Sequence, residues 1–188
     1  MAVNLKNIIA NSLLSLNESQ SLDSITIKQI LEDTGISRQT FYNHFVDKND
    51  LIQYIYDTKI VPDFNDSNMN MNFHDSLLMT FLNIQKYHRF MKQACMMEGQ
   101  NCLKDYIFEH CKEFDLKWHQ ELYGEKLPEA LKFATIYHAT ASSSMTLSWI
   151  LSDMPVSVEE ITKMIVEMRS LGMDTLFSSG KTKENPYK

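Results

Sequence analysis

Apolar residues recur at three- and four-residue steps along most of the chain, the spacing that places side chains on one face of an α-helix. The first such segment runs from Leu5 to Leu16, and the polar stretch at residues 19–24 follows it. No segment alternates apolar and polar residues for long, and Gly and Pro are scarce, with 5 and 4 copies in 188 residues. The pattern therefore predicts an all-α fold.

Short helices are predicted in the N-terminal quarter of the chain. The second helix leads to Gly35, which stands where a residue with left-handed backbone commonly ends a helix. Ser37 then occupies an N-cap position, and we predict a third helix that runs through Phe45. Asp47 can cap a fourth helix, so three short helices precede a linking one.

Longer helices are predicted after the polar stretch at residues 63–76, which is the longest interruption of the apolar pattern. We place a boundary between two modules near its start. The predicted helices beyond it cover residues 74–97, 101–122, 128–151 and 158–177.

Composition narrows the class of protein. Apolar residues make up 44% of the chain and charged residues 22%, a balance that is typical of globular domains with a buried core. Three cysteines without a pairing pattern, and no apolar run long enough to cross a membrane, predict a cytoplasmic protein. The net charge of −6 argues against non-specific coating of nucleic acid, although it permits a local recognition surface.

Residues 35–45, GISRQTFYNHF, contain no acidic side chain although the chain is acidic. Two short helices joined by a Gly-containing turn and packed on a third form a helix-turn-helix, in which the second helix enters the major groove of DNA. With Phe41 and Phe45 facing inward, polar side chains occupy the outer face. The candidate DNA-binding residues are Lys28, Ser37, Arg38, Gln39, Thr40, Tyr42, Asn43, His44 and Lys48.

The side chains on this outer face suit different parts of a DNA duplex. The amides of Gln39 and Asn43 can pair with adenine, and Arg38 can pair with guanine. The hydroxyl of Tyr42 suits a phosphate, a contact that sets the register on the DNA rather than the sequence. The Lys48 ammonium and the N-terminus of its helix are together expected to hold a phosphate. An acid-free segment is thus explained by a polyanionic partner.

Residues 26–52, TIKQILEDTGISRQTFYNHFVDKNDLI, resemble the DNA-binding region of the TetR family of transcriptional regulators. The resemblance implies double-stranded operator DNA as a partner, a homodimer, and a variable helical domain that senses a signal. Residues 135–161 are similar to the C-terminal domain of a Firmicutes-type branch of this family. That branch includes regulators of dihydroxyacetone kinase operons, which act as activators through a partner protein.

Together these observations predict four regions. They are a helix-turn-helix DNA-binding domain at residues 1–46, a linking helix at 47–62, a helical regulatory and dimerisation domain at 63–177, and a polar tail at 178–188. Residues 1–60 carry five Lys and Arg against seven Asp and Glu. We therefore expect the acids to face away from DNA and the affinity to be modest and sensitive to salt.

The last two predicted helices are the candidates for the dimer interface. Small residues in the helix at 128–151, among them Ala141 and Ser144, permit close helix approach, and Met168 and Leu171 in the last helix follow the spacing of a bundle. Two such helices from each subunit would form a four-helix interface. The alternative is a helix pair that packs within one chain.

The middle helices are expected to hold any small-molecule effector. They are rich in methionine and aromatic residues, which fill irregular cavities and tolerate varied ligands, although the same residues also suit an ordinary core. The candidate pocket residues are Phe81, Tyr87, Met91, Met96, Trp118 and His138.

The sequence also contains histidine and cysteine residues that raise the question of a metal site or a catalytic site. His88, Cys95 and Cys102 recur every seven residues, and imidazole and thiolate suit zinc. However, Gly99 is expected to break the helix between the two cysteines, and the role of Cys111 is also open. No nucleophile turn or oxyanion hole is recognisable, so we predict no enzyme, and we predict no cofactor.

The sequence thus favours a repressor that is released by a small-molecule effector. The alternatives are an activator that works through a coactivator protein and a metal-responsive regulator.

Overall fold

The computed structural model describes residues 4–61 and 72–178, with side chains up to Leu171, and every element in these residues is helical. The elements are α1 (Leu5–Ser19), α2 (Ile27–Thr34), α3 (Arg38–Tyr42), α4 (Lys48–Ile55), the π-helical turn η1 (Tyr56–Ile60), α6 (Phe73–Lys86), α7 (His88–Met96), α8 (Leu103–Tyr123), α9 (Glu129–Leu151) and α10 (Val158–Ser178). The all-α prediction is confirmed.

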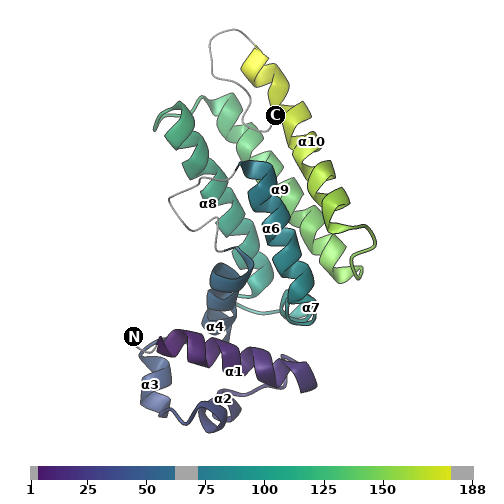
Figure 1. Cartoon of the computed structure of the whole chain (residues 1–188). Coiled ribbons are helices and arrows are strands. Elements are labelled where there is room, and N and C mark those ends of the chain that lie inside the picture. Colours follow the sequence, from purple (N-terminus) through teal and green to yellow (C-terminus); the bar gives the residue numbers. More distant parts are fainter. Residues whose placement is uncertain (1–3, 62–71, 179–188) are drawn as a thin grey trace.

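The helices form a head and a bundle (Figure 1). Helices α1, α2 and α3 make the head at one end, and α6, α8, α9 and α10 lie side by side in the bundle. Helix α4 leads from the head into the bundle, and α7 lies at the junction. The predicted domain boundary near residue 62 falls outside the described residues, and so does the predicted tail at 178–188 apart from Ser178, which ends α10.

Local capping rules build the head. The Thr26 hydroxyl accepts from the Gln29 backbone N–H while the Gln29 side chain accepts from the Thr26 N–H, so α2 begins with a capping box. Helix α2 ends at Gly35, whose φ of +69° is the left-handed conformation that Gly adopts without a steric cost. Ser37 caps α3 and Asp47 caps α4, as the sequence predicts.

Two helix predictions are wrong. The helix predicted at residues 74–97 is divided into α6 and α7 at Tyr87, whose backbone leaves the helical region (φ −104°, ψ 29°). The apolar spacing continues across this break, so periodicity alone did not reveal it. Helix α3 ends at Tyr42 rather than Phe45, although Phe45 keeps its predicted place in the core.

The break predicted at Gly99 is present. Helix α7 ends before Gly99 and α8 begins after it, so Cys95 and Cys102 do not share one helix. Both thiols are buried. Burial raises the pKa of Cys95 to about 12, which keeps this thiol protonated at neutral pH.

Helices α8 and α9 are joined by a buried pair of polar side chains. Thr135 donates its hydroxyl hydrogen to the Leu131 carbonyl oxygen at 2.7 Å, and its Oγ1 lies 2.7 Å from His119 Nδ1. Because a hydroxyl has one hydrogen, His119 Nδ1 is the donor in this contact. Burial lowers the pKa of His119 to about 4, so the ring is neutral at pH 7 with its hydrogen on Nδ1.

This histidine should make the protein less stable in mild acid. The unfolded chain binds a proton at His119 near pH 6.5, whereas the folded chain binds it only near pH 4. The stability that the neutral His119 contributes is therefore fully present above pH 6.5. It is lost as the pH falls toward 4, by up to about 3 kcal/mol. Denaturant unfolding from pH 7 to pH 4 should show a smaller loss of stability for His119→Gln than for wild type.

The exposed His74 supplies the matched control, because His74→Gln removes an imidazole that has no buried contact. If His119→Gln and His74→Gln followed the same pH profile as the wild type, the buried neutral histidine would not be responsible.

No helix in residues 4–61 or 72–178 is long and apolar enough to cross a membrane.

Candidate DNA-binding surface and regulatory cavity

The outer face of α3 carries two ordered pairs of side chains, each one helical turn apart. Gln39 Nε2 donates to Asn43 Oδ1 at 3.0 Å. The Arg38 guanidinium lies 5.5 Å from the centre of the Tyr42 ring and donates to its hydroxyl at 3.5 Å. All four side chains are exposed, so the structure brings together the residues that we predicted to read bases and contact phosphates.

Other predicted residues on this segment hold α3 in place. The Ser37 hydroxyl accepts from the Thr40 backbone N–H at 3.0 Å and lies 2.8 Å from the Thr40 hydroxyl. Thr40 and His44 are half-buried at the edge of the outer face. On α2, Lys28 is exposed and lies 3.6 Å from Glu32. Lys28 is therefore engaged with a neighbour on its own helix, and the structure shows no hydrogen bond or ion pair between Lys28 and α3 among the described residues.

Lys48 has a structural contact in place of the phosphate contact that the sequence predicts. Its ammonium donates to the carbonyl oxygens of Leu22, Asp23 and Ile25 at 3.1, 2.9 and 3.0 Å. An ammonium has three hydrogens, so this conformation leaves none for a phosphate. Burial lowers the Lys48 pKa, and the nearby Asp23 opposes this effect. Lys48 therefore closes the turn that precedes α2.

Several acids of the head are engaged within it, which explains how an acidic module can present an acid-free face. The Asp33 carboxylate accepts from the Ser12 hydroxyl at 2.5 Å. Asp47 caps α4, and Asp50 accepts from the Val46 backbone N–H at 2.8 Å. These carboxylates are engaged by contacts within the head and at the start of α4, and their orientation away from DNA stays a prediction.

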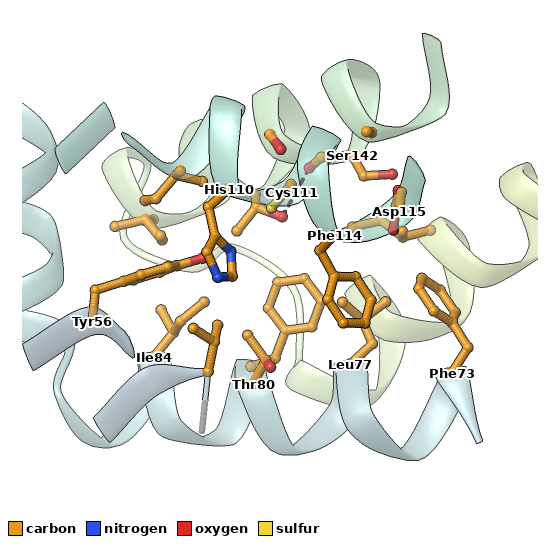
Figure 2. A pocket seen from close by; sticks show the side chains of 18 of the residues that line it. Tyr56, Phe73, Leu77, Thr80, Ile84, His110, Cys111, Phe114, Asp115 and Ser142 are labelled. Carbon is orange, nitrogen blue, oxygen red and sulfur yellow. Dashed lines mark hydrogen bonds between the residues drawn. The ribbon is translucent and has the colours of Figure 1, made fainter. Parts of the chain in front are cut away.

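The bundle contains a cavity of about 80 Å³ between α6, α8, α9 and α10, with Tyr56 of η1 at one end (Figure 2). Of the predicted pocket residues, only Phe81 and Met91 line it. Met96 is 63% exposed, and Trp118 stacks on the ring of Phe73 instead.

Two further pocket predictions also miss the cavity wall. Tyr87 stands at the break between α6 and α7, and His138 contacts the exposed Tyr137.

The polar residues of the cavity wall were not predicted. Arg169 of α10 forms a buried ion pair with Asp115 of α8. Its Nε donates to the Ser142 hydroxyl at 3.1 Å, and its guanidinium lies 4.7 Å from the centre of the Phe73 ring. The sequence holds little signal for this group, because its members come from four helices that are distant along the chain.

A second polar group links the cavity to η1. The Tyr106 hydroxyl donates to Asp57 at 2.8 Å. His110, which lines the cavity, lies 5.8 Å from the rings of both Tyr106 and Tyr56. Burial lowers the pKa of His110, against the opposing effect of Asp57, so its ring is neutral at pH 7.

Helix α7 is bonded to the end of α1. Arg89 donates to the carbonyl oxygens of Asn17 and Gln20 at 2.6 and 3.3 Å. The Gln93 side-chain oxygen accepts from the Leu22 backbone N–H at 2.6 Å and from the Asn17 amide at 3.1 Å. Because carbonyl groups at a helix end have no partner within the helix, these contacts tie the bundle directly to the head.

Within residues 4–61 and 72–171, no three His, Cys, Asp or Glu side chains gather as a metal site would require.

Residues 71–170 match a family model described as "Transcriptional regulator C-terminal region", which is a TetR-type domain. The match covers more than half of the chain. The chain belongs to the TetR family of transcriptional regulators. The resemblance drawn from the sequence is thereby confirmed, and the matched proteins of this family are regulators rather than enzymes.

One relative within the TetR family is the HTH-type dhaKLM operon transcriptional activator DhaS of Lactococcus lactis subsp. lactis (strain IL1403). It is 24% identical over 123 residues, which are 60% of this chain and 66% of the relative. The match therefore spans just under two thirds of that protein.

Solved structures show the same fold. The dihydroxyacetone kinase operon activator DhaS superposes with a TM-score of 0.70 at 21% identity, covering 94% of this chain and 99% of that one. A TetR-family regulator from Streptomyces coelicolor gives 0.61 at 17% identity, covering 93% and 83%. One from Syntrophomonas wolfei gives 0.58 at 15%, covering 89% and 94%.

Proposed function

We propose that this TetR-family chain binds operator DNA as a homodimer through α3, and that a small molecule in the bundle cavity controls its affinity. The observation that carries the proposal is the exposed outer face of α3, where Arg38, Gln39, Tyr42 and Asn43 lie together without an acid. Amide and guanidinium groups in this arrangement can read base edges in the major groove.

Exposed apolar side chains on α9 and α10 support the homodimer. Phe133, Tyr137 and Met145 follow helical spacing on α9 and are 74%, 61% and 57% exposed. Met168 and Leu171 on α10 are 63% and 67% exposed. Exposed apolar surface of this kind marks an interaction site, and its position on the last two helices matches the predicted interface.

The sequence allows two roles for the last two helices, a dimer interface or a helix pair within one chain. Each role fits one side of α10. Ile161 and Ile165 are buried within the chain, while Met164 is 44% exposed. One side of α10 therefore packs inside the subunit, and the other side is available to a second copy.

Repression is the first candidate for the direction of control, because a protein bound across a promoter excludes the polymerase and the cavity provides a place for a releasing ligand. Activation is the second candidate, because the Lactococcus lactis relative is named as an operon activator. Transcription in vitro from a promoter that carries the operator, with and without the protein, distinguishes the two by the sign of the change.

The bonds between α7 and α1 provide a route from the cavity to the head. Met91 lies on the cavity wall and stands between Arg89 and Gln93 in the sequence. The side chains of Arg89 and Gln93 form hydrogen bonds at the end of α1. A ligand that favours one position of α7 would shift the population of head positions, and a ligand with equal affinity for both positions would change nothing.

Gln39→Ala and Tyr42→Phe should weaken operator binding in different ways. Gln39→Ala should relax the preference for one base pair in each half-site by about 1–3 kcal/mol, since it removes an amide that pairs with a base edge. Tyr42→Phe should weaken binding to all sequences alike, since it removes a phosphate contact. Titration against operators with single base-pair changes measures both effects.

His74→Gln, far from the head on α6, is the matched control for these titrations. Unchanged operator affinity and base preference in both α3 variants would show that α3 is not the recognition helix.

A further inference from the structure

We propose that the bundle cavity selects a small, uncharged, largely apolar molecule that carries one hydrogen-bonding group. The inference rests on the proposed function, because it names the class of effector that the cavity would take. It follows from the composition of the wall, from the pairing of its charges, and from one buried hydroxyl.

Most of the wall is apolar. Side chains from five helices surround the space, among them Leu77, Phe81, Ile107, Ile150 and Ile165. An apolar wall favours an apolar occupant, because a polar one would lose its bonds to water without replacing them. The body of the ligand should therefore be hydrocarbon.

The charges of the wall cancel each other. Among the described residues that line the cavity, only Asp115 and Arg169 carry a formal charge, and they form a buried ion pair. Arg169 also donates to Ser142 and faces the Phe73 ring. A charged ligand would enter a space whose opposite charge is already engaged, and burial of a charge without a counter-charge is costly.

The other titratable side chains of the wall are neutral at pH 7. Burial lowers the pKa of His110, and it raises the pKa values of Cys111 and Tyr56. Each shift favours the uncharged form. Neither a carboxylate nor an ammonium ion would find an unengaged opposite charge in this wall.

One polar group of the wall calls for a hydrogen-bonding partner. The Ser143 Oγ atom is buried beside the Cys111 thiol and has no nitrogen or oxygen partner among the described residues. By contrast, Thr80 and Thr146 donate to backbone carbonyl oxygens within their own helices. The Cys111 thiol is only a weak hydrogen-bonding partner for this hydroxyl, so a ligand with one stronger hydrogen-bonding group would satisfy it better.

The volume limits the size of the ligand. A cavity of about 80 Å³ is roughly half of the 150 Å³ of an engineered apolar cavity that binds benzene. At roughly 15 Å³ for each water-sized atom, a cavity of about 80 Å³ takes a molecule of about five non-hydrogen atoms.

The test uses four probes of this size and of nearly identical shape. Butan-2-one and propanamide are neutral, propanoate is an anion, and butan-2-ylammonium is a cation. Saturation-transfer NMR with the full-length protein at pH 7 gives the affinity of each probe at millimolar concentrations. We expect at least one neutral probe to bind at least ten-fold more tightly than either ion.

Asp115→Asn should reverse this order for the anion, because it leaves the Arg169 guanidinium without its carboxylate. Propanoate should then bind more tightly than butan-2-one. The matched control is Asp105→Asn, which removes an exposed carboxylate from the same helix and should leave the wild-type order unchanged. The wild-type comparison decides the question alone if Asp115→Asn does not fold.

Binding of propanoate or butan-2-ylammonium to the wild type as tightly as the neutral probes would overturn the inference, and so would binding of none of the four. Operator binding, measured separately, tests the proposed function. Neutral probes that bind without changing the operator affinity support the cavity's selectivity and count against its role as the effector site.

Discussion

Arg169→Met should destabilise the folded protein by about 3–5 kcal/mol, because it leaves the buried Asp115 carboxylate without its counter-charge. The variant also loses the contact of the guanidinium with the Phe73 ring and its bond to Ser142. For a chain of this length the loss corresponds to a fall in Tm of roughly 6–20 °C. Thermal and denaturant unfolding at pH 7 measure it.

A double variant separates the cost of an unpaired charge from the value of the pair. Arg169→Met combined with Asp115→Leu removes both charges and fills the space with apolar atoms, so it should recover most of the lost stability. A single variant that lost less than about 1 kcal/mol would show that the ion pair is not a buried structural element. A double variant as unstable as the single one would assign the cost to packing.

Phe133→Asp should convert the proposed dimer to a monomer and lower operator affinity by about 10²–10⁴-fold. In a two-fold interface the same residue contributes from both subunits, so one substitution places two carboxylates in the apolar contact. A monomer binds one half-site at a time and loses the gain from linked binding. Sedimentation velocity gives the assembly state, and titration with operator DNA gives the affinity.

Gln120→Glu is the matched control, because it adds one carboxylate at an exposed position of α8, outside the exposed apolar surface on α9 and α10. It should leave both the assembly state and the operator affinity unchanged. If Phe133→Asp remained a dimer with wild-type affinity, the apolar surface of α9 and α10 would have another purpose.

The sequence was informative where structure depends on residues close together in the chain. Gly35, Ser37 and Asp47 were placed correctly as helix ends because capping is decided within a single turn. The inward faces of Phe41 and Phe45 likewise follow from their four-residue spacing. These rules fixed the face of α3 on which the candidate DNA-binding residues lie.

The errors arose where a residue's partner is distant in the chain. Lys48 was assigned to a phosphate because its carbonyl acceptors lie 23 to 26 residues earlier. The break at Tyr87 turns α7 so that Arg89 can reach the end of α1. The apolar spacing continues across this break and therefore does not reveal it. Sequence-based choice of aromatic and methionine residues included the exposed Met96 and omitted the charged pair in the cavity wall.

Selection from a pool of random DNA duplexes tests the central claim most directly, using the purified wild-type protein and Gln39→Ala in parallel. We predict that the wild type enriches a symmetric site whose two half-sites lie about 34–36 Å apart, one helical turn of DNA. Gln39→Ala should enrich the same site with one relaxed position in each half. A folded wild-type protein that enriches no sequence, or a Gln39→Ala profile identical to the wild type at every position, would contradict recognition of DNA by α3.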